Sequence, residues 1–151
     1  MQSLIQVMVI FVFFSIINPV SAQSDPYEIV EKFFKSYETK GSSMALEELY
    51  ATNLWMRKSE DAILKLKNQM EGLTEDFIGS YHGYEFITEK QASESFILLT
   101  YLVKFDRQPI RFSFQFYKPQ DTWRVHSFQY DGNLGAELEE SARIHYINYG
   151  M

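Results

Sequence analysis

The residues best suited to proton transfer lie in a short stretch around His82, which also contains Tyr81, Tyr84 and Glu85. A histidine with carboxylate or phenol partners can move protons at neutral pH. A histidine in a structured turn can equally be held by a hydrogen bond that only stabilises the turn. Both interpretations remain open from the sequence, and His82 and Glu85 are candidate catalytic residues.

The spacing patterns of common metal and nucleotide sites are missing. The three histidines, His82, His126 and His145, form no His-X-X-X-His pair, which is the usual kind of local metal-binding signature. The absence of cysteine excludes disulfides, thiolate metal sites, cysteine nucleophiles and a lipid-modified N-terminal cysteine. No glycine-rich phosphate loop, serine nucleophile elbow or EF-hand loop occurs. We therefore expect neither a metal nor a cofactor.

Length and composition indicate one folded domain. The chain has 151 residues, of which 46% are hydrophobic and 17% aromatic, which is far too apolar for a disordered protein. Its net charge is −6. A nucleic-acid partner is not expected, because such a surface needs a basic patch.

The N-terminal segment has the pattern of an export signal. Residues 4–20 are nearly all apolar, no charged side chain precedes Asp25, and small residues surround Ala22. We predict a signal peptide over residues 1–22, cleaved after Ala22. The alternative is an uncleaved anchor, since about 17 apolar residues can just span a bilayer.

Export without cysteine and without an Asn-X-Ser/Thr sequon favours the bacterial periplasm or the extracellular medium. After cleavage we expect no membrane association. The remaining chain divides into a domain over residues 23–135 and a tail over residues 136–151.

Residues 26 to about 78 are predicted to be helical with short joints. Asp25 precedes Pro26, which suits a capped helix start, and Gly41 suits its end. Ser43 and Ser59 are expected to cap two further helices. The pairs Glu28–Lys32 and Glu31–Lys35 have the i,i+4 spacing of exposed ion pairs.

From Tyr81 to Asp131 the pattern changes to β-branched and aromatic residues with a period of two. We predict four strands over residues 81–91, 95–106, 109–118 and 122–131. The links are too short for crossover helices, so the strands are expected to be antiparallel neighbours. A bulge near His126–Ser127 would return Phe128 to the inner face. The tail is ambiguous between a helix and an edge strand.

This order of elements resembles the nuclear-transport-factor-2-like superfamily, the cystatin-like α+β cone, and its small secreted members of unknown function in particular. The resemblance covers about residues 25–131. It depends on the element order, on residues 79–85 before the first strand, on the long hairpin of strands two and three, and on residues 123–128. The fold class expected is therefore α+β, with N-terminal helices packed on a curved, cone-shaped antiparallel sheet.

The resemblance implies two surfaces. The concave face can leave a pocket for a small apolar or aromatic ligand, although the same aromatic spacing also suits a filled core. The pocket candidates are Phe33, Phe34, Tyr37, Trp55, Tyr101, Phe112, Phe114 and Trp123. The outer face would form a homodimer. Its candidates are Phe96, Leu98, Leu102, Arg111, Ser113, Gln115 and Tyr117.

Fold alone does not assign function in this superfamily. We expect a non-catalytic module that binds a small ligand or another protein. The alternative is a small cofactor-independent enzyme of the isomerase or dehydratase type, in which Glu85 acts as base, Tyr101 as donor and His82 as a proton carrier.

Overall fold

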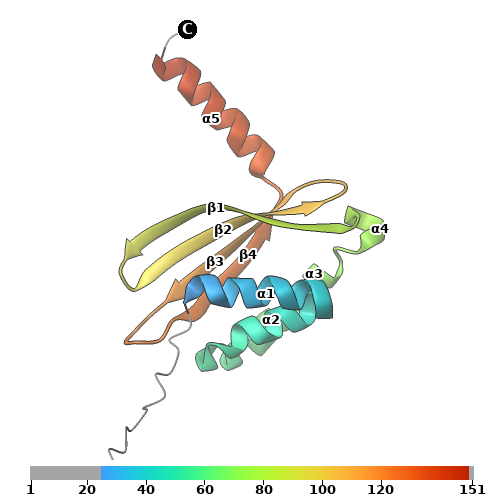
Figure 1. Cartoon of the computed structure of the whole chain (residues 1–151), viewed down its shortest axis with the longest axis vertical. Helices are drawn as coiled ribbons and strands as arrows, with labels where there is room; N and C mark the ends of the chain where they lie inside the picture. Colours follow the sequence, from blue (N-terminus) through green and yellow to red (C-terminus); the bar gives the residue numbers. More distant parts are fainter. Residues whose placement is uncertain (1–24, 150–151) are drawn as a thin grey trace, which may run out of the picture.

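The structure is a computed structural model that describes residues 25–149, and the predicted signal peptide lies outside these residues. Helices come first, then a sheet, then one further helix (Figure 1). The helical part comprises α1 (Pro26–Lys40), α2 (Ser42–Ala51), the 3-10 helix η1 (Leu54–Ser59), α3 (Glu60–Glu71) and α4 (Glu75–Ile78). The strands are β1 (Tyr81–Ser93), β2 (Phe96–Phe105), β3 (Ile110–Tyr117) and β4 (Arg124–Asp131), followed by α5 (Leu134–Tyr149). The α+β class is confirmed.

The predicted helix boundaries are partly confirmed. The Asp25 carboxylate accepts a hydrogen bond from the Tyr27 backbone N–H at 2.9 Å, as expected of an N-cap. Gly41 ends α1 with a φ of 88°, a conformation that favours glycine. The same glycine starts α2, so the cap predicted at Ser43 is wrong. Ser59 does precede α3, but its side chain makes no capping bond.

The four strands form an antiparallel meander in the order β1-β2-β3-β4. Pairing between β3 and β4 shifts register by one residue. Gln115 lies opposite Ser127, and the next residue, Phe116, lies opposite Val125. His126 is therefore the extra residue of a bulge. Val125 and Phe128 are consequently both buried, and the predicted bulge is confirmed. Pairing between β1 and β2 shifts register at three places.

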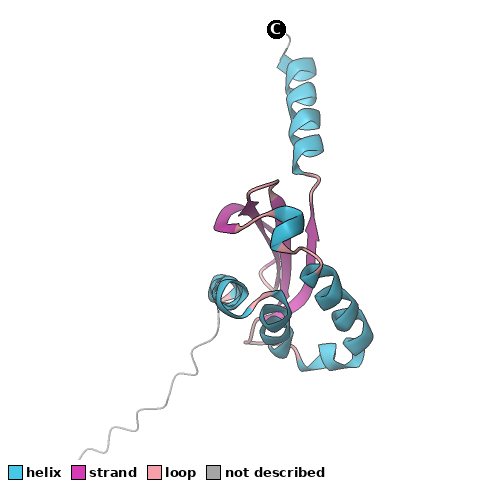
Figure 2. Ribbon diagram, turned by 90° about the vertical axis from the view of Figure 1, so that its right-hand side faces the viewer, coloured by secondary structure: helices cyan, strands magenta, loops and turns pink. Residues whose placement is uncertain are grey.

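The core lies between α1, α2 and the inner face of the sheet. Figures 1 and 2 show α1 and α2 side by side next to the strands. Side chains of β3 alternate between buried and half-buried, as the period-two pattern predicted. Asn53 is buried between α2 and η1, and its Nδ2 donates to the Val125 carbonyl of β4 at 2.7 Å. This bond joins the helices to the sheet.

The tail adopts the helical alternative. α5 follows directly after β4 and projects away from the rest of the molecule in both views (Figures 1 and 2). Its described side chains are exposed from residue 135 to residue 145.

Candidate functional site

The interior predicted as a possible pocket is filled by aromatic rings. Phe33 and Phe34 of α1 and Phe112 and Phe114 of β3 are each no more than 1% exposed. The ring centroids of Phe33 and Phe114 are 5.1 Å apart at a steep angle, and those of Phe33 and Phe112 are 6.2 Å apart. Such edge-to-face contacts are the favourable geometry of a packed aromatic core. These four residues therefore act as core residues.

The remaining predicted pocket residues are dispersed. Tyr101 is buried against the rings of Phe34 and Phe114. Tyr37 lines a separate cavity at the end of α1, and Trp123 is half-buried near the start of β4. Trp55 lies apart from these residues, because it is on η1, is 67% exposed and has the Lys58 ammonium over its ring at 5.2 Å.

The catalytic candidates do not converge. Glu85 is exposed and pairs with Lys104 at 3.0 Å, whereas Tyr101 is buried on the inner face. His82 bonds through Nε2 to Asp106 Oδ1 at 2.6 Å, and both side chains are more than half exposed. The three candidates therefore have separate environments and do not surround a common cavity.

The His82–Asp106 pair ties the start of β1 to the end of β2. Hydrogen bonds from His82 and from the Ser80 backbone N–H lower the pKa of the Asp106 carboxyl. Gly79 allows this close approach, since a Cβ there would lie 2.4 Å from that of Asp106. The geometry matches the interpretation of His82 as a hydrogen-bonded residue at a structured turn.

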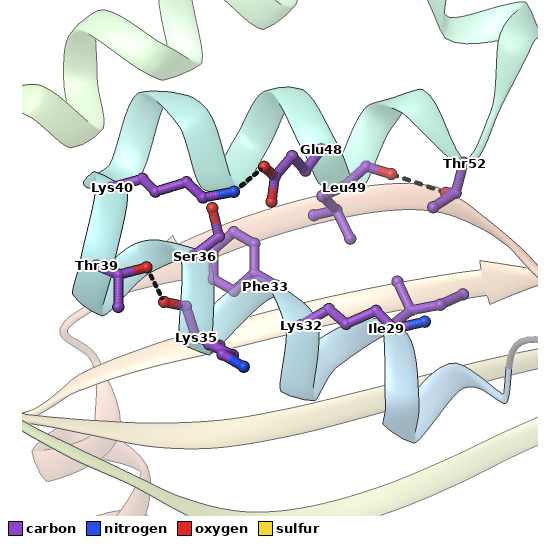
Figure 3. A pocket seen from close by; sticks show the side chains of 10 residues that line it. All are labelled: Ile29, Lys32, Phe33, Lys35, Ser36, Thr39, Lys40, Glu48, Leu49 and Thr52. Carbon is purple, nitrogen blue, oxygen red and sulfur yellow. Dashed lines mark hydrogen bonds and ion pairs between the residues drawn. The ribbon is translucent and has the colours of Figure 1, made fainter.

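A cleft between α1 and α2 combines apolar and charged lining residues. Its volume is about 340 Å³. Figure 3 shows its lining residues, which come from both helices and from the residue after α2: Ile29, Lys32, Phe33, Lys35, Ser36, Thr39, Lys40, Glu48, Leu49 and Thr52. Phe33 is the one lining residue that belongs to the predicted pocket set.

The base of the cleft is apolar. Ile29, Phe33 and Leu49 are at most 5% exposed. They project into the space between the two helices because they occupy the facing sides of α1 and α2. An apolar group placed there would be removed from water at little structural cost.

Polar groups cluster at one end of this base. Lys40 bonds to Glu48 at 2.6 Å, and that bond lowers the pKa of the Glu48 carboxyl. Ser36 is buried, and its Oγ has no hydrogen-bond partner among the described residues. Figure 3 shows the Ser36 hydroxyl and the Lys40 ammonium on the side of the cleft that faces Glu48. The buried hydroxyl thus has hydrogen-bonding capacity left for a ligand.

Lys32 and Lys35 provide the uncompensated charge of the cleft. The sequence predicted i,i+4 pairs with Glu28 and Glu31, but neither forms an ion pair in the described part of the chain. Both ammonium groups lie across the cleft from the Lys40–Glu48 pair (Figure 3). Sequence reasoning missed this site, because it depends on how α1 and α2 pack against each other.

The predicted dimer residues lie on the outer face of the sheet. Leu98, Arg111, Ser113 and Gln115 line a shallow hollow of about 260 Å³. Leu102 pairs with Arg111, and Phe96 pairs with Tyr117, so all seven share this face.

Residues 25–149 hold no cluster of three potential metal ligands among histidines and carboxylates. None of their helices is both long and apolar enough to cross a bilayer.

Comparison with known proteins finds no matching family model, no matching curated protein and no matching solved structure. The function must therefore be argued from the geometry of the chain itself.

Proposed function

We propose that this protein is an exported, non-catalytic module that binds a small amphipathic anion in the cleft between α1 and α2. The observation that carries the proposal is the buried apolar base beside two lysines that have no acidic partner in the described chain. A carboxylate with an apolar or aromatic body matches this combination. The body would cover Ile29 and Leu49, and the carboxylate would meet Lys32 or Lys35.

The dimensions and charges support such a ligand. A volume of about 340 Å³ lies at the small end of the range for ligand pockets. Lys40 is already neutralised by Glu48, so the attraction for an anion comes from Lys32 and Lys35. A hydrogen bond to a charged group contributes about 1.5–3 kcal/mol when it is well formed. The Ser36 hydroxyl would add a polar contact at the buried end.

We also propose that the chain belongs to the nuclear-transport-factor-2-like cones and acts outside the cytoplasm. The order of N-terminal helices followed by an antiparallel meander supports the first point. The apolar run of residues 4–20 before Ala22 supports the second. N-terminal sequencing of protein recovered from the exported fraction tests this part, and a chain that still begins at residue 1 would overturn cleavage.

Binding is tested with laurate, which has one carboxylate and an apolar chain, by isothermal titration calorimetry. A Lys32→Gln/Lys35→Gln double variant should weaken binding about 10-fold, equivalent to about 1.4 kcal/mol. Thr39→Trp should block the cleft, because Thr39 is an exposed lining residue and the larger ring can enter without disturbing the core.

The matched control is Lys65→Gln on α3, an exposed lysine outside the cleft. It should leave laurate binding unchanged. Equal affinity in the wild type and in both cleft variants would place the ligand elsewhere, and absence of any laurate binding would contradict the proposed ligand class.

A further inference from the structure

The C-terminal helix α5 has no packing partner within the described chain. Its side chains from residue 135 to residue 145 are exposed, and Leu138 is 70% and Ile144 46% exposed. The helix has 16 residues. Isolated helices of about this length are only marginally stable in water. A surface that covers α5 would therefore stabilise it.

The outer face of the sheet is a second uncovered surface. Phe96, Leu98 and Leu102 are half-buried there, around the hollow of about 260 Å³. The helices α1 and α2 pack on the inner face and leave this side open. An outer face with three large apolar residues is typical of an interaction surface.

Arg111 links the start of α5 to the end of β4. Its guanidinium bonds to Asp131 at the end of β4, with Nε–Oδ2 at 3.0 Å and Nη2–Oδ1 at 3.1 Å. The same group bonds through Nη1 to Glu137 in the first turn of α5 at 2.6 Å. One planar cation thus fixes the strand end and the helix start together. In Figure 1 the helix continues outward from β4.

Size and charge make the two surfaces complementary. At about 1.5 Å per residue, α5 is about 24 Å long. The eight residues of β3 span about 26 Å at about 3.3 Å each. Two basic residues lie on the outer face, since Lys90 is opposite Leu98 and Arg124 is opposite Tyr117 in the strand pairing. Neither basic side chain has an ion pair in the described chain. On α5, Glu139 likewise has no ion pair there.

We propose that two copies of this chain form a symmetric dimer in which α5 of each copy lies along the outer sheet face of the other. Leu138 would enter the hollow beside Leu98, and Glu139 would face the basic side chains of the partner. The exchange is reciprocal, so the assembly closes as a dimer and does not polymerise.

The absence of cysteine permits a direct crosslinking test in the full chain. Leu138→Cys and Ser113→Cys are made as separate variants, and one is isotope-labelled before the two are mixed and oxidised. We expect a disulfide-linked dimer that contains one labelled and one unlabelled chain. The matched control pairs Ser113→Cys with Asn68→Cys on the exposed side of α3, and this mixture should give no crosslink.

Three results would overturn the proposal. A monomer-sized oxidised product from a chain carrying both Leu138→Cys and Ser113→Cys would show that α5 folds onto its own sheet. Ser113→Cys crosslinking to itself, but not to Leu138→Cys, would show that two sheets meet face to face. Absence of the mixed crosslink, together with a monomer in sedimentation, would show that the helix has another partner or none.

A charge and burial variant adds an equilibrium measurement. Leu138→Asp should raise the dimer dissociation constant at least about 10-fold in sedimentation, because it places a carboxylate in an apolar contact. Its exposed position on α5 lets the rest of the chain fold normally. An unchanged dissociation constant would contradict the proposed position of Leu138 in the hollow of the partner's outer sheet face.

Discussion

The two faces of the sheet differ in what covers them. On β3, Phe112, Phe114 and Phe116 are fully buried, whereas Arg111, Ser113 and Gln115 are half-buried. The inner set meets rings contributed by α1, such as Phe33, which lies 5.1 Å from Phe114. Within residues 25–149, the outer set is linked to a helix by the ion pair between Arg111 and Glu137. A single strand therefore supplies both the core of the domain and a surface open to other molecules.

The comparison shows how little the period-two pattern alone says about function. Alternation fixes which residues share a face. It does not determine whether a face is covered by the chain, by a ligand or by a second copy. That outcome depends on helices distant in sequence, so it must be tested on each face separately.

The largest loss of stability is expected when a buried ring is removed from the inner face of the sheet. Phe114→Ala removes a ring that is fully buried and touches Phe33, Tyr101 and Phe128. The free energy of unfolding should fall by about 3–5 kcal/mol. Urea denaturation measures it, with Ser113→Ala on the outer face as the matched control, which should change it by less than about 0.5 kcal/mol. Similar losses in both variants would remove the distinction between the faces.

A smaller effect is expected where the helices are bonded to the sheet. Asn53→Ala removes the donor to the Val125 carbonyl and the acceptor for the Trp55 backbone N–H. Because the carbonyl lies in a buried site, the loss should be about 1–3 kcal/mol in the free energy of unfolding. Asn68→Ala, on the exposed side of α3, is the control. A loss below that of the control would mean that water replaces the bond.

Alkaline pH should lower the free energy of unfolding through a tyrosine that packs against the inner face. Burial raises the pKa of Tyr37 from 10.0 to about 12, so the folded state keeps a proton that the unfolded state releases. Stability should therefore decrease as the pH rises from 10 towards 12. Tyr37→Phe should reduce this decrease in urea denaturation series, whereas Tyr117→Phe, which is exposed on the outer face, should not. An identical alkaline decrease in both variants would contradict this assignment.

The smallest effect on stability is expected at the exposed His82–Asp106 pair, which belongs to neither face of the sheet. The lowered pKa of Asp106 means that its bonds stabilise the fold above the unfolded pKa of about 3.9. The contribution is lost as the pH falls through the lower folded pKa. Asp106→Asn should lower the melting temperature slightly at neutral pH, and the difference from wild type should shrink in acid. Asp121→Asn, in an exposed turn, is the control. A difference that is constant with pH would exclude the carboxylate as the cause.

The sheet could be predicted from the sequence because its signals are local. The aromatic alternation in residues 110–117 and the out-of-phase Phe128 were enough to place the strands and the bulge at His126. Antiparallel order followed from the short links. Each inference needed only neighbouring residues and the geometry of a strand.

The cleft could not be predicted in the same way. It exists because α1 and α2 pack side by side with Ile29 and Leu49 facing a space that neither fills. Lys32 and Lys35 looked like partners for acidic residues on the same helix, and such surface pairs are too weak to be enforced by spacing. Trp55 was predicted as a pocket residue from the spacing of the aromatic side chains, whereas the structure has it exposed on η1. The positions of the catalytic candidates likewise depended on which face of the sheet each residue of β1 and β2 occupies.

The irregular pairing of the outermost strands has a consequence for solubility. β1 and β4 both leave backbone N–H and C=O groups free at the sheet margins. Such margins can recruit strands from other chains and start fibrous aggregates. In this protein, β1 shifts register at three places and β4 bulges at His126, so neither margin offers a long straight row of free groups. The bulge that returns Phe128 to the core therefore also interrupts the row of free backbone groups along β4 that another chain could pair with.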